Sequence, residues 1–257
     1  MNRIITTLFG LLLIQLLVAK NTYSDEGEVK DCFEKLNRAT FALNMGLDKV
    51  IFKPIAKGYR KLPSPIRTGT GNALSNLSNL ITIPNNLLQG DFGSAANNGV
   101  RLLINTTLGI AGIFDPADSF GFEKREKEDF GQTLGVMGVG EGCYLVLPVL
   151  GPTTVRDTVG SFVAMNGGDV WHNITVRDDE DYVEEFKESD YWVSRVTSGV
   201  DFRAKNLEAF DAMEKNSIDL YATVRSLYLQ DRKKKINNSS EKTEAMEDGD
   251  WDTLENQ

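Results

Sequence analysis

Residues 128–148 constrain the fold of this 257-residue chain more than any other stretch, because they are both glycine-rich and apolar. The five glycines are Gly131, Gly135, Gly138, Gly140 and Gly142. Glycine gives a backbone freedom that the interior of a helix or strand avoids, whereas a solvated linker would be polar. Two interpretations follow: a compact buried loop of tight turns, or a chain that bends while it contacts an apolar partner.

Residues 1–24 have the pattern of a secretory signal peptide. Arg3 precedes a largely apolar run, residues 4–19, and a polar segment follows. Cleavage after Ala19 or after Ser24 fits the small residues there; an uncleaved membrane anchor is the alternative, although the run is short of the about 20 residues of a spanning helix. No cysteine ends the apolar run, so we expect an exported chain without a lipid-modification site at that point.

The composition, 41% hydrophobic and 25% charged, suits one large folded domain with a core. The formal net charge is −9, and no contiguous basic patch suggests nucleic acid as a partner. Charge also does not draw an acidic chain to anionic lipid. Any membrane contact is therefore expected to be mainly apolar.

The two cysteines, Cys32 and Cys143, are too far apart in sequence for a zinc ribbon or a redox CxxC motif. In an oxidising compartment they could form one disulfide, which requires Cα atoms within about 7 Å. Spacing in the sequence does not show that proximity. We therefore expect two separate thiols.

Apolar residues at helical spacing predict a mostly α-helical domain with amphipathic helices and glycine-rich apolar loops. The expected helices cover residues 32–55, 68–88, 94–108, 182–200 and 207–229. Pro84 is expected to stop the second helix, with Gly90 as the terminating residue, and Pro152 is expected to open a further helix. Residues 144–149 give the one strand signal. Residues 25–232 are taken as one domain, ring-like or compact, and the polar residues 233–257 as a disordered tail.

The sequence offers no positive support for catalysis. It lacks the GxSxG, HExxH and Walker patterns. His172, the only histidine, is interpreted as structural, since a metal site needs several convergent donors. Carboxylate groups such as Asp115 with Asp118, or those at 178–180, are interpreted as surface features. We predict no catalytic residue, no cofactor and no metal site.

Six stretches resemble, in order, the MlaA (VacJ) family, an outer-membrane component of the machinery that maintains phospholipid asymmetry. They cover residues 33–60, 79–91, 101–117, 128–148, 151–160 and 219–232. The resemblance implies a helical ring in the inner leaflet of the outer membrane, on its periplasmic side. It also implies association with a trimeric porin, and an amphipathic channel that passes misplaced phospholipid to a periplasmic carrier protein, with no reaction catalysed.

Two sets of candidate residues follow. The lipid channel or its gate is assigned to the five glycines above together with Asn97, Arg101 and Asn105, which form the polar side of the 94–108 helix. An amphipathic helix as apolar as 32–55 either packs in a core or lies in a lipid interface. Its candidate membrane-facing residues are Phe33, Leu36, Phe41, Leu43, Leu47, Val50 and Phe52.

Two features depart from the family pattern. Members commonly carry an acylated first cysteine, and Cys32 does not replace it because it lies inside the first matching stretch. Cys143 stands where the family often has a small residue or proline. The alternative to lipid passage is a non-transporting envelope scaffold or porin-binding protein; a lipid-modifying enzyme is disfavoured by the missing nucleophile and base.

Overall fold

The computed structural model describes residues 29–177 and 186–247, with side chains as far as Asn237. The predicted signal peptide, the carboxylates at 178–180 and the last ten residues lie outside this part. The described chain is mostly helical with one two-stranded sheet, so the predicted fold class is confirmed.

The elements follow one another with short connections, in this order: α2 (Glu34–Leu47), η1 (Asp48–Phe52), α3 (Lys53–Tyr59), α4 (Ser64–Leu88), α5 (Phe92–Thr107), α6 (Pro116–Ser119), α7 (Phe130–Val136), β1 (Tyr144–Leu147), β2 (Gly151–Thr154), α8 (Val155–Val163), η2 (Ala164–Gly168), α9 (Val170–His172), η3 (Asn173–Arg177), α10 (Glu188–Lys205), α11 (Leu207–Asn216) and α12 (Leu220–Glu247).

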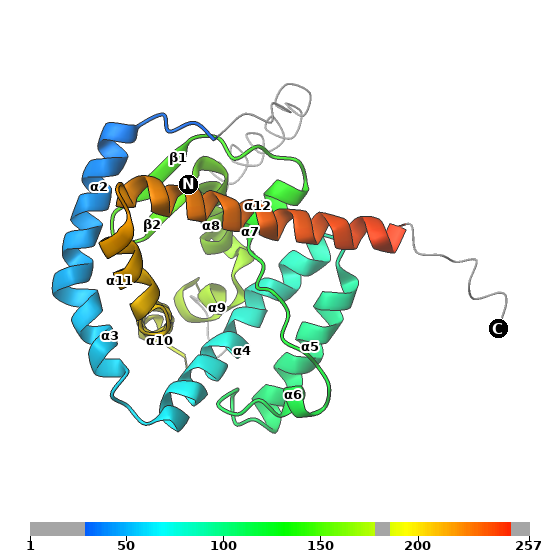
Figure 1. Ribbon diagram of the computed structural model, residues 1–257. Helices are drawn as coiled ribbons and strands as arrows, with labels where there is room; N and C mark the ends of the chain where they lie inside the picture. The colour runs from blue at the N-terminus through cyan, green and yellow to red at the C-terminus, as the bar shows by residue number, and fades with distance from the viewer. Residues whose placement is uncertain (1–28, 178–185, 248–257) are drawn as a thin grey trace.

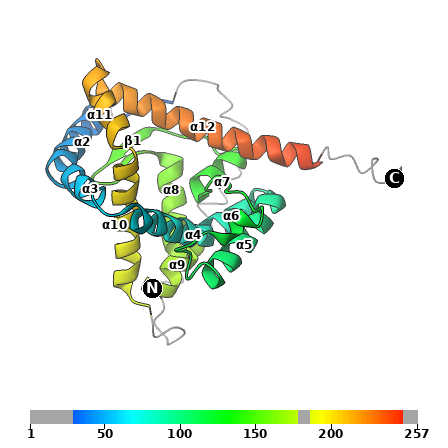
Figure 2. The same ribbon diagram turned by 60° about the horizontal axis from the view of Figure 1, so that its bottom comes forward.

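The long helices follow the outline of the molecule. In Figure 1, α2 and α3 form one side of the molecule, and α4 and α5 pack side by side on the other. Helix α12 crosses from the α2 end to the α5 end, and α8 and α9 lie within this outline. Figure 2 shows α12 along one edge and α9 at the opposite edge. Both views show the C-terminal part of α12 projecting beyond α7.

The predicted helix over 32–55 is confirmed and extends to Tyr59. A π-helical turn, η1, precedes α3, and Pro54 lies in the first turn of α3. Proline has no backbone N–H, and Lys53 before it donates to the Asp48 carbonyl in the π-helical pattern, so the helix continues through Pro54 without one hydrogen bond. The break expected near Pro54 is therefore a change in helical type rather than an end.

The prediction that Pro84 stops the second helix is wrong. Helix α4 runs through Pro84 to Leu88, and it packs along α5. Tertiary packing along 25 residues outweighs the one backbone hydrogen bond that proline removes. The terminator itself is confirmed: Gly90 has φ 80°, and the amides of Gly90 and Asp91 donate to the carbonyls of Leu87 and Asn86.

Residues 128–148 divide into a helix, a turn and a strand, so neither sequence interpretation describes the whole stretch. Asp129 caps α7 by accepting from the Gln132 amide at 2.9 Å. Strand β1 confirms the strand signal and pairs antiparallel with β2, Tyr144 opposite Thr154. Pro152 lies in β2, not at the start of a helix, so that prediction is wrong; Thr154 caps α8 instead.

Three predicted boundaries in the C-terminal part change. The helix expected over 182–200 is α10, which begins at Glu188 and ends at Lys205. The helix expected over 207–229 is two helices, because the chain turns between Asn216 and Leu220. Helix α12 then continues to Glu247, so no element ends at Arg232 and the tail expected to be disordered is helical as far as Glu247.

Cys32 and Cys143 form a disulfide with Cα atoms 5.6 Å apart, so the expectation of two separate thiols is wrong. Polar contacts bring the two segments together: the Tyr144 amide donates to the Lys30 carbonyl at 2.9 Å. The Asn37 side chain donates to the Tyr144 carbonyl and accepts from the Val146 amide, at 3.0 and 2.9 Å. These non-local contacts are invisible in the sequence spacing.

Removing this disulfide by combining Cys32→Ser with Cys143→Ser is expected to lower the free energy of unfolding by about 2–4 kcal/mol, since the bridge closes a long loop in the unfolded chain. Chemical denaturation in detergent measures the change. Reducing the wild-type chain is the control, and it should reproduce the loss while leaving the double variant unaffected. Equal midpoints for the oxidised wild type and the variant would contradict a stabilising role.

Candidate functional site

The described part of the chain has polar side chains inside and apolar side chains outside. Most of its buried side chains are polar or charged, while many large apolar side chains are exposed. The apolar interior is confined to small clusters, one around Ala56, Ala204 and Leu207 and another around Tyr144, Val146 and Tyr221. A water-soluble domain shows the opposite distribution of polar and apolar side chains.

The candidate membrane-facing residues divide into two groups. Phe33, Leu36, Leu43 and Val50 are exposed, Val50 by 75%. Phe41, Leu47 and Phe52 are half-buried, and the Phe41 ring packs edge-on against Tyr221 at 5.6 Å. The outward surface of α2 and η1 is therefore apolar, and the inward surface contacts the body of the protein.

The exposed apolar side chains continue well beyond α2. They occur on α5 (Leu103), on the loop after it (Ile110 and Phe114), at the β1–β2 turn (Leu150) and on α10 (Val193). Leu150 is 80% exposed. Such an extent exceeds the scattered single residues that are normal on soluble proteins.

Polar side chains join the C-terminal end of α4 to α7 in the interior. Thr133 donates to Asn85 Oδ1 at 2.6 Å and accepts from Gln89 at 2.9 Å. Gln89 also donates to Glu128, at 3.1 Å. Each of these four side chains is buried, so the contact between α4 and α7 is a hydrogen-bonded one. In a medium of low polarity, such bonds are strong when they are satisfied.

The structure brings Arg101 and Asn105 together but sets Asn97 apart. Arg101 donates from one nitrogen to both oxygens of Asp115 at 2.8 Å, and Asn105 donates to the same carboxylate at 2.8 Å. Asn97 instead donates to the Glu123 carbonyl at 2.9 Å. Asp115, whose side chain is 12% exposed, is thus an ion-pair partner of α5, and the interpretation of this carboxylate as a plain surface feature is wrong.

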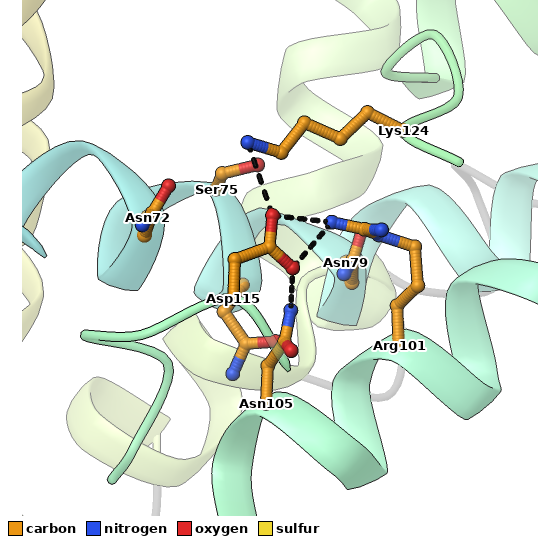
Figure 3. Close-up of a pocket in the computed structure, with 8 residues that line it drawn as sticks. Asn72, Ser75, Asn79, Arg101, Asn105, Asp115 and Lys124 are labelled. Carbon is orange, nitrogen blue, oxygen red and sulfur yellow. Dashed lines mark hydrogen bonds and ion pairs between the residues drawn. The ribbon is translucent and has the colours of Figure 1, made fainter. Parts of the chain in front are cut away.

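A small polar pocket lies between α4 and α5, beside this ion pair (Figure 3). It is lined by Asn72, Ser75, Asn76, Asn79, Arg101, Asn105, Asp115 and Lys124. The α4 residues recur at helical spacing and so share one face of the helix. Lys124 forms an ion pair with Asp115 at 3.0 Å from the more exposed side. The pocket therefore opens where charged side chains meet a row of amides.

Lys127 borders the same pocket. Its ammonium donates to the Ser75 carbonyl at 2.9 Å and to Asn79 Oδ1 at 2.6 Å. Burial, together with the positive charges of Arg101 and Lys124, lowers the pKa of Lys127 to about 8. The ammonium donates to neutral acceptors, which do not cancel its charge. The pocket therefore carries a positive potential.

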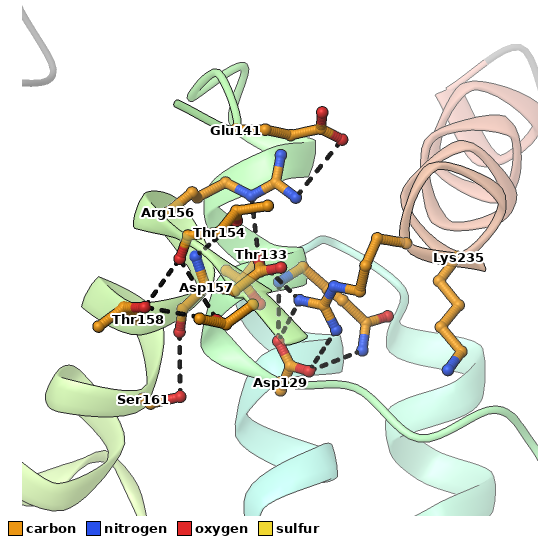
Figure 4. A network of polar contacts seen from close by, with 12 residues as sticks. Asp129, Thr133, Glu141, Thr154, Arg156, Asp157, Thr158, Ser161 and Lys235 are labelled. Atoms are coloured by element: carbon orange, nitrogen blue, oxygen red, sulfur yellow. Dashed lines mark hydrogen bonds and ion pairs between the residues drawn. The ribbon is translucent and has the colours of Figure 1, made fainter. Parts of the chain in front are cut away.

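A second charged cluster joins α12 to α7 and α8 (Figure 4). Arg232 donates to Asp129 at 2.7 and 2.9 Å and to Asp157 at 2.8 Å, and Tyr228 donates to Asp157. Despite burial, these hydrogen bonds hold the pKa of Asp129 down, at about 2, while burial and the Asp157 charge raise the pKa of Tyr228. The cluster fixes the projecting helix to the domain.

The five candidate gate glycines have different environments. A Cβ on Gly131 would lie 2.5 Å from Asp157 Oδ1, and one on Gly135 would lie 2.6 Å from Ile236 Cδ1. These two glycines let α7 approach its neighbours closely. Gly138 ends α7 in the left-handed region, with φ 85°. Only Gly138 and Gly140 have open space around the Cβ position, in the exposed turn before β1, since Gly142 meets Val155.

Sequence reasoning missed Lys124, Lys127 and the row Asn72, Asn76 and Asn79. The charged run at residues 123–129 has the pattern of a solvated loop or a helix start, although Lys127 is half-buried and Glu128 is buried. The available signal was the spacing of the asparagines, which repeats every three or four residues and places them on one helical face.

His172 behaves as a packing residue. Its ring lies edge-on to Tyr191 at 4.9 Å. In the described ranges, no group of three His, Cys, Asp or Glu side chains is placed to hold a metal ion. None of the described helices combines the length and the apolar character that crossing a bilayer requires.

Comparison with known proteins matches residues 29–235 to the family model described as MlaA lipoprotein. A protein of Rickettsia prowazekii (strain Madrid E) is 36% identical over 77% of this chain and 75% of its own. The intermembrane phospholipid transport system lipoprotein MlaA of Haemophilus influenzae is 30% identical over 95% of both chains, and the one of Escherichia coli K12 is 31% identical over 80% and 78%. A solved chain from work on the "structural basis for maintenance of bacterial outer membrane lipid asymmetry" is 31% identical, with a TM-score of 0.67 over 80% of this chain and 99% of its own.

The close approach at Gly131 gives a stability prediction. Gly131→Ala is expected to lower the free energy of unfolding by about 1–3 kcal/mol, because the new methyl group overlaps Asp157 and Arg232. Gly140→Ala is the matched control, since no heavy atom lies within 4 Å of its Cβ position. Urea unfolding in detergent compares the two. A loss for Gly140→Ala as large as that for Gly131→Ala would refute the packing role.

Proposed function

The chain belongs to the MlaA lipoprotein family, and from that premise we propose that it is an outer-membrane phospholipid-passage protein. It removes misplaced phospholipid from the outer leaflet and so maintains lipid asymmetry. Relatives named as components of an intermembrane phospholipid transport system, and the related structure concerned with outer-membrane lipid asymmetry, support this proposal.

The single observation that carries the proposal is the exposed apolar surface around a polar interior. Burying apolar area contributes about 25 cal/mol per Å², so exposed side chains such as Leu36, Val50 and Leu103 favour insertion among acyl chains. We place the domain within one leaflet, the inner leaflet of the outer membrane, with its helices lying in the interface; the exposed apolar side chains and the family resemblance support this placement.

The polar interior supports passage of the lipid head group. A phospholipid that crosses a leaflet must keep its charged head among polar groups while its tails remain in an apolar medium. The amides of α4 and α5 and the cations Arg101 and Lys124 offer polar groups, and the exposed apolar surface adjoins acyl chains. This arrangement needs no chemical step, and the proposed role is not catalytic.

The proposed route continues with partners. Residues 1–24 direct export, a trimeric porin holds the domain in the outer membrane, and a soluble periplasmic carrier receives the lipid. The family resemblance supports these three assignments. The apolar surface also offers a porin contact within the leaflet, since a membrane-embedded interface is itself apolar.

The direct test is the phospholipid content of the outer leaflet in cells with and without this chain. Deletion is expected to raise outer-leaflet phospholipid, and the wild-type chain is expected to reverse the rise. Labelling of surface aminophospholipid in intact cells measures it. No rise on deletion, in cells without a second clearance pathway, would favour the scaffold alternative.

The exposed turn at Gly138 and Gly140 gives a prediction about gating. Combining Gly138→Asn with Gly140→Val is expected to slow lipid clearance, because both glycines have open space around them and the turn then loses backbone freedom. Asparagine is chosen because it tolerates the left-handed φ of Gly138. The readout is again outer-leaflet phospholipid, at matched protein levels.

Gly121→Asn is the control, since Gly121 also has a left-handed φ, 87°, with open space and lies outside the turn. Clearance at the wild-type rate by a folded Gly138/Gly140 variant would remove the turn from the gating mechanism.

A further inference from the structure

The pocket between α4 and α5 has more positive than negative charge. Arg101 and Lys124 line it, Lys127 borders it, and among the described residues that line it the carboxylate is Asp115, which pairs with Arg101 and Lys124. The nearby carboxylate of Glu128 accepts instead from Gln89. Two cations and one carboxylate in the lining, with Lys127 at the border, contrast with the net charge of −9 of the chain. A fixed positive site of this kind attracts an anion.

The cations also have hydrogen-bond donors to spare. A lysine ammonium has three N–H donors. Lys127 uses two of them on Ser75 and Asn79, and Lys124 uses one on Asp115. The lowered pKa of Lys127, about 8, reflects its burial and the unfavourable proximity of Arg101 and Lys124. An additional anion would relieve that repulsion, and it would accept the unused N–H groups.

The pocket also offers an unused acceptor. Asn76 Oδ1 is buried and has no hydrogen-bond partner among the described residues, while its amide nitrogen donates to Thr106 at 2.9 Å. A buried acceptor without a partner is unfavourable. A hydroxyl group on the ligand would satisfy it. The space inside is small, so it admits single oxygen atoms while the rest of the ligand stays at the mouth.

Exposed apolar side chains lie next to this polar pocket. Asn72, on its wall, donates to the carbonyl of Ile113 at 3.3 Å. Ile113 and Phe114 are themselves exposed, Phe114 by 58%. An anionic group in the pocket would therefore have apolar surface beside it, which is the arrangement that an amphiphile with an anionic head and acyl tails requires.

We propose that Arg101, Lys124 and Lys127 form a binding site for the phosphate of a phospholipid head group, with Asn76 accepting from a head-group hydroxyl and Phe114 contacting the acyl chains. This inference rests on the proposed function and adds a specific binding site for the lipid head group to it. Phosphatidylglycerol has the matching chemistry, since its head carries one negative charge and free hydroxyls.

The test is isothermal titration of the full exported chain, disulfide intact and in detergent, with dihexanoyl-phosphatidylglycerol below its micelle concentration. Combining Lys124→Met with Lys127→Met is expected to weaken binding roughly tenfold or more, because each charged hydrogen bond contributes about 1.5–3 kcal/mol. Lys57→Met with Lys61→Met is the matched control, since both lysines are exposed on the distant α3 side, and it should bind as the wild type does.

Two further variants keep the test decisive. Lys124→Met alone changes a side chain that is 57% exposed, so its effect is readable even where the double variant unfolds. Phe114→Ser is expected to weaken the lipid and leave inorganic phosphate unchanged. Unchanged lipid affinity in the folded lysine variants would overturn the site. Inorganic phosphate that binds the wild type as tightly as the lipid would show a free-anion site and overturn the head-group assignment.

The binding result and the cell experiment are separable. Loss of lipid binding in the lysine variants supports the site whatever the wild-type chain does to outer-leaflet phospholipid. Conversely, a wild-type chain that clears lipid while its lysine variants bind normally keeps the proposed function and removes this site.

Discussion

The structure depends on polar contacts between helices whose apolar sides point outward. Thr133 links Asn85 to Gln89, and Gln89 reaches Glu128, so α4 and α7 meet through hydrogen bonds rather than through leucines. In water, amides have a competing partner in the solvent, and such contacts contribute little net stability. Within a leaflet the competition disappears, and every polar group must find its partner inside the protein. The interior polarity and the exterior apolarity therefore both fit the proposed location within a leaflet.

Two further connections hold the ends of the chain to this helical frame. The Cys32–Cys143 disulfide and the Asn37 side chain join the start of α2 to β1. Arg232, paired with Asp129 and Asp157, joins α12 to the first turns of α7 and α8. Arg232 and Asp157 are both buried, so removing either one leaves an uncompensated charge, which is costly. With both ends fixed, the glycine-containing turn before β1 is left as an exposed segment with open space around it.

The sequence was informative where a local rule decides the structure, and silent where distant contacts do. Gly90 was predictable because a helix end in the left-handed region favours glycine, and the 94–108 helix because its two sides differ in polarity. The prediction from Pro84 was wrong because packing against α5 keeps α4 helical on both sides of this proline. The turn between α11 and α12 does not interrupt the helical spacing of the apolar residues in 207–229, so the sequence predicted one helix there. The disulfide depends on a spatial proximity that spacing in the sequence does not show. Helical spacing shows which residues share one face of a helix, but it does not show whether that face is buried. Hence Arg101 and Asn105 could be placed on one polar side of a helix, whereas their contacts with Asp115 and the pocket with Lys124 and Lys127 became apparent only in three dimensions.

The central claim is that the apolar exterior lies among acyl chains. It is tested most directly by spin labels on single added cysteines at Leu36, Leu103 and Val193, with Lys233 as the polar reference; both native cysteines are occupied by the disulfide. In phospholipid vesicles the account predicts that labels at the three apolar positions collide mainly with oxygen, which concentrates in the bilayer, and that the label at Lys233 collides mainly with a water-soluble nickel complex. Preferential collision with the nickel complex at all four positions, on vesicle-bound protein, would contradict it.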